Sequence, residues 1–507
     1  MNRISMMNKV IPVTPLCLAL VLMLLGGCGG SSGPDPNPPA PTPLSATNLN
    51  LIFVVSEDLT YHASGDINPR TANFTSQGLQ RSLLMAPFLQ QQVLGSQNVT
   101  GIYALEPMTH LQTAKNYPDM VGLETIQQFA MLNRITLSRG SNSPVTGNSY
   151  PLNASYSSAP VPDGVAQPLL TCPGKSGLPP YNCQGLDFRD LEQANESLVS
   201  NIVKAGRPGF YVFSAPWETI SVLMANINRL EGYNLVVPAR YAGPNYIYAM
   251  AIAPSGGATL VTYNSDIVPS ASYPTLPAGG IVTASCLPAS TNTTFHIQVT
   301  GGVDGAVVPA GMNRNETVYL VRHAEAHPAS WWDDGNYIAA GQWRALDLPY
   351  ALRGKIQPTL VYSIDPAQVL PGGTSQEGSF YSYVRTNLTV LPYAIANDLP
   401  YNLAASFELL AQNPPAPATA ASNFFFTGET FSNQSLLVGW EHDHIPPTVN
   451  ALLASYHGKD QSAPNWPDDD FDTVWTVKLD DNGNLSIDNA TCEGINSAAL
   501  PPTPPQF

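Results

Sequence analysis

The chain has 507 residues, of which 44% are apolar and only 11% are charged, with 48 prolines and a net charge of −16. This length suffices for about two or three domains with buried cores. The negative charge argues against a nucleic-acid partner, because phosphate backbones are bound by basic surfaces. The net charge is compatible with a small anionic substrate, since a few arginines in one pocket can outweigh a distant acidic surface.

Residues 1–27 have the pattern of a signal peptide, in which basic residues precede an apolar run over 16–25. The run leads to Cys28, and residues 25–28 resemble the lipobox of bacterial lipoproteins. This resemblance implies cleavage before Cys28 and attachment of a lipid to its sulfur. Residues 28–46 are rich in Gly and Pro and predict a tether. We expect a protein of the bacterial cell envelope, outside the cytoplasm, held at the membrane by this lipid alone.

Residues 47–272 predict a first α/β domain. A buried strand and acidic loop over 49–58 precede the helical pattern F-T-S-Q-G-L-Q-R-S-L-L-M-A-P-F-L. Further strands follow at 99–107, at 210–218 and from Asn245.

An interdomain segment at 273–311 leads to a second domain at 312–492, and a Pro-rich tail occupies 493–507. Four segments of the second domain repeat the earlier order of strand and loop: 316–325, 358–366, 436–444 and the strand from Phe471. The repetition predicts two homologous α/β domains with largely parallel sheets. Ligands of such sheets bind beyond the carboxyl ends of the strands.

Arg322 and His323 follow a buried strand of the second domain, and V-Y-L-V-R-H-A-E resembles the signature of the histidine phosphatase superfamily. The segments S-Y-V-R-T-N-L-T, L-L-V-G-W-E-H-D-H-I-P and W-P-D-D-D-F-D-T-V-W are similar to later family segments and follow in the family's order. The resemblance covers the second domain. It implies the phosphoglycerate-mutase-like fold, with tandem three-layer α/β/α domains here.

The resemblance also implies the chemistry of phosphomonoester hydrolysis. A neutral His323 would attack phosphorus and form a phosphohistidine. Arg322 and Arg385 would bind the phosphoryl oxygens in a forked geometry, and His442 would stabilise the charge that develops. The substrate would be a small phosphorylated molecule. This mechanism needs no metal and no cofactor.

Two assignments within this resemblance stay open. His444 competes with His442 as the second histidine, because W-E-H departs from the common S-H-G form. The proton donor to the leaving group is Asp443, which directly follows the second histidine, Glu408, which lies downstream of the second arginine, or Glu441.

Several neighbouring features have simpler interpretations. The run 442–444 does not predict a metal site, since adjacent side chains point in different directions. The acidic residues at 468–472 predict a solvated turn rather than a calcium site. His327 and Trp331-Trp332 follow the signature and either line the pocket or cover it.

In the first domain the family's phosphate-binding positions hold no arginine: Val55, Ser56, Thr109 or His110, and Ser214-Ala215-Pro216. We therefore expect a non-catalytic scaffold, pocket cover or binding module. Arg70 is expected in a loop, and Arg81 on a solvated helix face.

With Cys17 removed and Cys28 lipidated, four cysteines remain: Cys172, Cys183, Cys286 and Cys492. An even number in an oxidising compartment predicts two disulfides, with three pairings to choose from. Cys172 and Cys183 flank a turn-rich loop, so we pair them, which leaves Cys286 with Cys492. The spacings do not fit a zinc site.

The sequence thus predicts an exported phosphomonoester hydrolase, with a phosphohistidine at His323 and a non-catalytic first domain. The alternative is a non-enzymatic surface lipoprotein that uses both domains for binding. An intact Arg-His-Arg-His arrangement would favour the enzyme, and a blocked or distorted pocket would favour the alternative.

Overall fold

The computed structural model describes residues 42–133, 148–155, 185–190, 193–277, 281, 285–286, 294–327, 334–367, 369–371, 380–404, 415–457 and 461–507. We call residues 42–277 the first half and residues 294–507 the second half. Cys28, Cys172, Cys183, Glu408 and Trp331-Trp332 lie outside the described residues, so the expectations about them stay predictions. Within the described ranges, no helix has the length and apolar character needed to cross a membrane.

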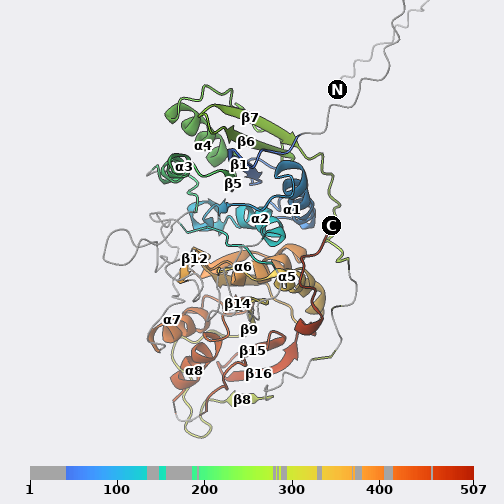
Figure 1. Cartoon of the computed structure of the whole chain (residues 1–507). Helices are drawn as coiled ribbons and strands as arrows, with labels where there is room; N and C mark the ends of the chain where they lie inside the picture. The colour runs from blue at the N-terminus through green and yellow to red at the C-terminus, as the bar shows by residue number, and fades with distance from the viewer. Residues whose placement is uncertain are drawn as a thin grey trace, which may run out of the picture. The chain divides into compact units, whose positions relative to one another are not determined.

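The first half contains a sheet with the strand order β2-β5-β1-β6-β7 (Figure 1). The strands are β1 (Leu49–Ser56), β2 (Gly101–Ala104), β5 (Gly209–Pro216), β6 (Tyr246–Ile252) and β7 (Ala258–Asn264). The helices are α1 (Ser76–Phe88), α2 (Val121–Leu132), α3 (Ala194–Ala205) and α4 (Trp217–Leu230). Every residue of β1 is buried, as expected of a central strand rich in β-branched residues. Helix α1 begins after Thr75, whose hydroxyl accepts hydrogen bonds from two amides of the first turn.

The second half contains a sheet with the order β13-β10-β14-β9-β15-β16-β8. The strands are β8 (His296–Val299), β9 (Glu316–Arg322), β10 (Leu360–Ile364), β13 (Tyr401–Ala404), β14 (Ser435–Trp440), β15 (Thr473–Leu479) and β16 (Leu485–Cys492). The helices are α5 (Ala339–Ala351), α6 (Arg385–Ala396), α7 (Pro415–Phe426) and α8 (Ile445–Ser455). Two small hairpins join β3 (Leu111–Gln112) to β4 (Tyr117–Pro118) and β11 (Val369–Pro371) to β12 (Phe380–Ser382). Short helical turns are η1 (Leu89–Val93), η2 (Pro107–Thr109) and η4 (Ser497–Ala499).

The predicted α/β class with parallel strands is confirmed, but the prediction of largely parallel sheets is wrong. Strands β1, β2 and β5 run parallel to one another, as do β9, β10, β13 and β14. The closing strands are antiparallel to their neighbours: β6 and β7 in the first sheet, and β15, β16 and β8 in the second. Short turns join β6 to β7 and β15 to β16, and such turns connect antiparallel strands. The order β10-β14-β9-β15-β16 repeats β2-β5-β1-β6-β7.

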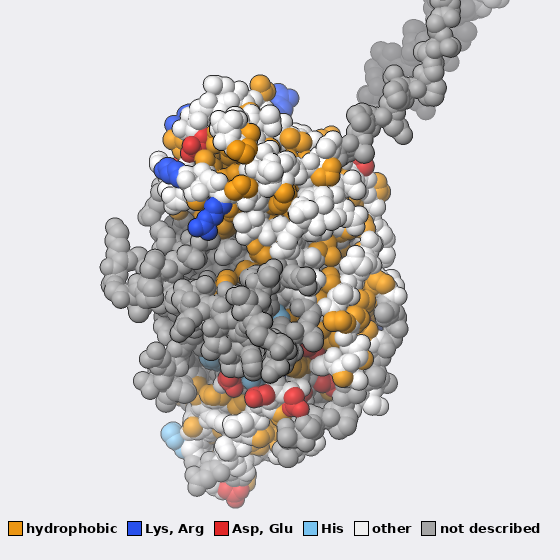
Figure 2. All heavy atoms as spheres, in the orientation of Figure 1, with side chains coloured by type: hydrophobic (Ala, Val, Ile, Leu, Met, Phe, Trp, Pro, Cys, Tyr) orange, Lys and Arg blue, Asp and Glu red, His pale blue; other side chains and the backbone are white. Residues whose placement is uncertain are grey.

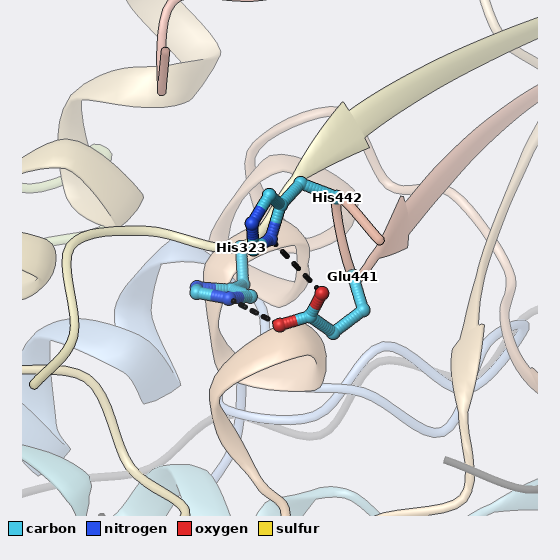
Figure 3. Close-up of side chains that lie close together, drawn as sticks. All are labelled: His323, Glu441 and His442. Atoms are coloured by element: carbon cyan, nitrogen blue, oxygen red, sulfur yellow. Dashed lines mark hydrogen bonds and ion pairs between the residues drawn. The ribbon is translucent and has the colours of Figure 1, made fainter. Parts of the chain in front are cut away.

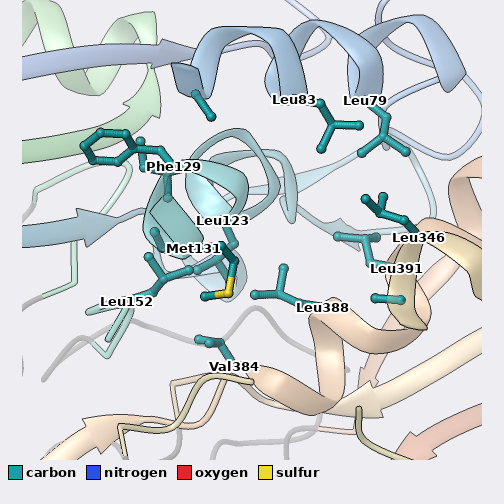
Figure 4. Close-up of a cluster of buried hydrophobic side chains, with 14 of the residues drawn as sticks. Leu79, Leu83, Leu123, Phe129, Met131, Leu152, Leu346, Val384, Leu388 and Leu391 are labelled. Atoms are coloured by element: carbon teal, nitrogen blue, oxygen red, sulfur yellow. The ribbon is translucent and has the colours of Figure 1, made fainter. Parts of the chain in front are cut away.

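Helices α1 and α2 of the first half pack against α5 and α6 of the second half (Figure 4). Leucines of both pairs belong to one hydrophobic cluster: Leu79, Leu83, Leu123, Leu346, Leu388 and Leu391. Each fully buried leucine side chain contributes about 1.5–3 kcal/mol. Helix α4 packs against the other face of the first sheet, and residues of α7 and α8 join a separate cluster with the second sheet. The two halves therefore share a central core.

A disulfide joins Cys286 to Cys492, and their Cα atoms are 5.4 Å apart. This confirms the predicted pairing of these two residues. The bond ties the segment before β8 to the last residue of β16 across 206 positions of sequence.

Candidate active site

His323 directly follows β9 and is 2% exposed. Its backbone amide donates to the carbonyl of Trp440 at 2.9 Å, which continues the pairing of β9 with β14 by one residue. Its ring Nδ1 lies 2.7 Å from the carbonyl oxygen of Ala324. Because a carbonyl can only accept, Nδ1 carries the ring proton, and Nε2 of the neutral ring keeps its lone pair. The backbone therefore selects the tautomer that a nucleophilic imidazole needs.

Arg322 ends β9, and its guanidinium lies over the Phe471 ring, 3.9 Å from the centroid. One terminal nitrogen, Nη1, donates to the carbonyl of Asp468 at 2.5 Å. Its Nε is buried and has no hydrogen-bond partner. A buried N–H without an acceptor is costly, so this atom provides a donor for an anion.

Arg385 is the first residue of α6, and its guanidinium lies over the Tyr383 ring, 4.4 Å from the centroid. Its Nη2 is 3.8 Å from Oε1 of Glu441. The Tyr383 hydroxyl donates to the same oxygen at 3.2 Å. Neither Tyr383 nor Phe471 was predicted as a site residue. The only sequence signals were that Tyr383 lies two residues before Arg385 and that Phe471 lies within the acidic turn.

Glu441 and His442 follow β14 and complete the site beside His323 (Figure 3). Oε1 of Glu441 is 3.2 Å from His323 Nε2, and Oε2 is 3.0 Å from His442 Nδ1. The two imidazole rings are 6.4 Å apart. We call Arg322, His323, Arg385, Glu441 and His442 the Arg-His cluster. The structure thus brings together the four predicted catalytic residues and places a carboxylate among them.

The remaining candidates lie differently. His444 precedes α8, and its ring stacks against Trp440 at 6.1 Å instead of facing His323. The Asp443 side chain is 78% exposed, and its Oδ1 is 3.6 Å from His442 Nε2. Of the two proposed proton donors that the structure describes, Glu441 is the one in contact with His323. Glu325 turns to Arg344, 2.8 Å away, and does not join the cluster.

Burial and the positive charge of Arg385 lower the pKa of His323 to about 4. The ring is therefore neutral at physiological pH. Burial by itself would raise the pKa of Glu441, but the neighbouring imidazoles of His323 and His442 hold this pKa well below its ordinary value. Glu441 is accordingly an anion in the cluster.

Donor atoms of His323, Glu441 and His442 lie within 4.8 Å of one another, so these residues have the composition of a metal site. The guanidinium of Arg385 borders the same carboxylate, and that of Arg322 contributes to the field at His323. Two fixed positive charges oppose a metal cation and favour an anion. No other such donor group occurs among the residues that the structure describes.

The prediction of a solvated acidic turn at 468–472 is only partly right, because Asp468 and Asp469 are exposed at a turn but Asp470 and Asp472 are buried. The buried Asp470 carboxylate accepts hydrogen bonds from the amides of Asp472 and Thr473, each at 3.0 Å, while the Asp468 side chain is 98% exposed.

Figure 2 shows Asp and Glu side chains gathered on the lower part of the face it presents, with Lys and Arg side chains on the upper part. A polar cavity of about 530 Å³ lies around Glu316 and Lys478, at the opposite end of β9, and contains no residue of the Arg-His cluster.

The corresponding strand ends of the first half hold different chemistry. Ser56 ends β1 and pairs with Pro216, which ends β5. Helix α2 begins at Val121, in the place in the element order where α6 begins at Arg385. Trp217 starts α4 and is buried. No arginine stands at these positions.

Of the two arginines considered in the first half, Arg81 departs from its predicted position and Arg70 does not. Arg81 is not solvated, because its side chain is 11% exposed and Nε binds Asp66 at 2.5 Å. It lies on a face of α1 that also meets the Asn245 side chain and the Ile267 carbonyl. Nδ1 of His110 lies 2.8 Å from a carboxylate oxygen of Asp119. Arg70 is exposed, as a loop position implies.

No protein-family model matches the chain, and no curated protein matches its sequence. Several solved structures are similar to part of it. A phosphoserine phosphatase from Entamoeba histolytica is 12% identical, covering 35% of this chain and 98% of its own, with a TM-score of 0.21. A SixA protein from Agrobacterium tumefaciens, described as a phosphohistidine phosphatase, is 16% identical, covering 33% and 92%, with a TM-score of 0.19. A SixA protein from Nakamurella multipartitia is 15% identical, covering 39% and 96%, with a TM-score of 0.19.

Proposed function

We propose that the chain is a phosphomonoester hydrolase that acts through a phosphohistidine at His323. The observation that carries the proposal is the Arg-His cluster itself. Nε2 of a neutral imidazole lies beside the Glu441 carboxylate, which Arg385 and a second histidine border, and Arg322 adds its positive charge at His323. The Glu441 carboxylate supports an anion site in this cluster, because a phosphoryl group has the same charge sign and similar acceptor oxygens.

In the first step, Nε2 of His323 forms a bond to phosphorus while the bond from phosphorus to the leaving oxygen breaks. Arg322 and Arg385 hold the phosphoryl oxygens, and His442 stabilises the charge that builds on them. Water then attacks phosphorus and gives a proton to the Glu441 carboxylate, the bond from phosphorus to Nε2 breaks, and phosphate leaves while His323 regains its lone pair. Phe471 and Tyr383 stack on the two arginines and restrict their orientation.

We assign the proton donor to Glu441. An entering phosphoryl group must displace its carboxylate from His323, and the negative charge of that group raises the pKa of the carboxyl beside it. Glu441 then takes up a proton and delivers it to the leaving oxygen. The side chain of Asp443 is 78% exposed to solvent, whereas that of Glu441 is 13% exposed and contacts His323.

The test is His323→Ala in the full chain, assayed with p-nitrophenyl phosphate. Turnover should fall by more than about 10²-fold, because covalent catalysis requires the nucleophile. Wild-type protein quenched during turnover should carry an acid-labile phosphoryl group that is missing from the variant. Activity of the variant within tenfold of wild type would exclude the proposed intermediate.

The alternative is a non-enzymatic binding protein, and Glu441 is the observation in its favour, since its carboxylate stands where a phosphoryl group would bind. Competition with orthovanadate separates the two functions. An enzyme should bind orthovanadate at the cluster and lose activity, whereas a site closed permanently by Glu441 should bind none.

We further propose that the two halves are homologous three-layer domains, the first non-catalytic, and that a lipid on Cys28 anchors the chain in the bacterial envelope. The repeated strand order supports the first proposal, and the Cys286–Cys492 disulfide is consistent with an oxidising compartment. Mass spectrometry of protein from a membrane fraction, with and without Cys28→Ser, tests the anchor.

A further inference from the structure

We infer that the first half positions the phosphate-binding Arg385, and that it does so through the loop formed by residues 334–337, here called the Gly335 loop. The inference rests on the proposed function for its catalytic consequence. It gives the first half, which we propose to be non-catalytic, a role in the candidate active site of the second half. Two sets of buried hydrogen bonds carry it.

The Gly335 loop fixes the start of α6. The carbonyl of Gly335 accepts the amides of Val384 at 2.9 Å and Arg385 at 3.1 Å. Amides at a helix start have no acceptor within the helix, so this carbonyl determines where the helix begins. Gly335 has a φ of +74°, and a Cβ there would collide with the carbonyl of Ser382. Only glycine fits this contact.

The first half holds the Gly335 loop in turn. Gln127 of α2 and Asn336 exchange two hydrogen bonds through their side-chain amides, each 3.0 Å long. Asn336 also donates to the carbonyl of Tyr150 at 3.0 Å. The Ser149 hydroxyl lies 2.7 Å from Oδ2 of Asp334 and 3.0 Å from the Tyr337 carbonyl. The first half therefore contacts three of the four residues of the loop.

A second connection reaches the residues just before α6. The amide of Ala154 donates to the Ser382 hydroxyl at 2.9 Å, and the Ser155 hydroxyl is 2.7 Å from the same oxygen. Ser382 stands three residues before Arg385 and shares the short segment that contains Tyr383. Polar groups so buried are costly to leave unpaired. The segment that carries Arg385 and its stacking partner is thus held from two sides by the first half.

Ser149→Ala in the full chain is the primary test, because it removes a hydroxyl of the first half that is absent from the Arg-His cluster. The inhibition constant for orthovanadate should rise about threefold to tenfold, the range that the loss of one buried hydrogen bond gives. The matched control is Ser214→Ala, whose hydroxyl binds the Gly122 carbonyl at 2.8 Å within the first half. The control should lower the melting temperature without changing the inhibition constant.

A double-mutant cycle with Arg385→Ala separates positioning from general destabilisation. In the Arg385→Ala background, Ser149→Ala should change orthovanadate inhibition by less than about 1.5-fold, because the residue through which it acts is gone. Gly335→Ala should raise the inhibition constant more than Ser149→Ala does, since it displaces the carbonyl itself.

Hydrogen exchange gives a readout that does not depend on catalysis. The amides of Val384 and Arg385 should exchange faster in Ser149→Ala than in wild type, and at wild-type rates in Ser214→Ala. Unchanged exchange at both amides would overturn the inference whether or not the chain is a phosphatase. Faster exchange with no orthovanadate binding by wild-type protein would instead remove the proposed function and leave the mechanical link in place. Faster exchange with an unchanged inhibition constant would refute the catalytic role of the link.

Discussion

Among individual residues, Glu441 decides how the site works, because its carboxylate contacts both histidines and borders Arg385. Glu441→Gln keeps the shape of the side chain but removes the charge that competes with phosphate. We expect the inhibition constant for orthovanadate to fall about tenfold, the effect of about 1.4 kcal/mol. Turnover of p-nitrophenyl phosphate should fall about 10²–10⁴-fold, because the proton donor is lost.

The control is Glu429→Gln, the same change at an exposed position, which should alter neither quantity. Asp443→Asn tests the other described candidate for the proton donor. If Asp443→Asn slows turnover more than Glu441→Gln does, the donor is misassigned.

The activity should also depend on pH through His323. Its pKa is lowered to about 4 by burial and by Arg385, from the ordinary 6.5. Protonation removes the lone pair that attacks phosphorus, so activity is lost only as the pH falls through the lowered pKa. We expect kcat/KM for p-nitrophenyl phosphate to stay constant from pH 7 down to about pH 5 and to fall near pH 4. An acidic limb centred near pH 6.5 would show an imidazole that is not desolvated as described.

Among the elements, the contact of α6 with β14 holds Arg385 close to Glu441. Gly439 in β14 makes this contact possible, because a Cβ there would lie 2.7 Å from a methyl of Val390 and 3.0 Å from the carbonyl of Thr386. Gly439→Ala should push α6 away and lower the free energy of unfolding by about 1–3 kcal/mol. Urea denaturation measures this loss.

Gly257→Ala is the matched control for that change, since its added Cβ would meet nothing closer than 4.0 Å. Gly439→Ala should also raise the KM for p-nitrophenyl phosphate, because Arg385 moves with the helix. Equal stability of the two variants would show that α6 does not rest on β14 in this way.

For the whole molecule, buried carboxyls make stability depend on pH. Burial raises the pKa of Glu124 to about 8, and burial raises that of Glu316 to about 8 against a smaller opposing effect of Asn313. A carboxyl whose pKa is higher in the folded state than in the unfolded chain contributes fully to stability when the pH lies below its ordinary pKa of 4.5. That stability is lost as the pH rises through about 8.

The melting temperature should therefore fall between pH 5 and pH 8. Glu124→Gln should reduce this dependence. One buried carboxyl with such a raised pKa lowers the free energy of unfolding by about 3 kcal/mol at pH 7. Glu429→Gln, at an exposed carboxyl, should leave it unchanged. Differential scanning calorimetry at matched ionic strength provides the measurement. A melting temperature that rises over this range would mean that water reaches these carboxyls.

The sequence by itself determined the local features of this protein. Short apolar runs that end in polar loops predicted strands such as β1, β9 and β14. Because side chains at a strand end emerge at the edge of the sheet, Arg322, His323 and His442 could be expected in one place. The pairing of Cys286 with Cys492 was the one that remained once Cys172 and Cys183 were paired across their loop. The mixed directions of the strands could not be predicted from the sequence, because the hydrophobic pattern of a strand does not encode the direction of its neighbour.

Tertiary structure decided what depends on partners far away in the sequence. Arg81 looked solvated by helical position, but Asp66, Asn245 and Ile267 surround it. Three carboxyls were candidate proton donors, and only the fold places Glu441 3.2 Å from His323, across 118 positions. The link from Ser149 to Asp334 spans 185 positions. Such contacts form when packed helices bring separate segments together, and the periodicity of one segment holds no information about its partner.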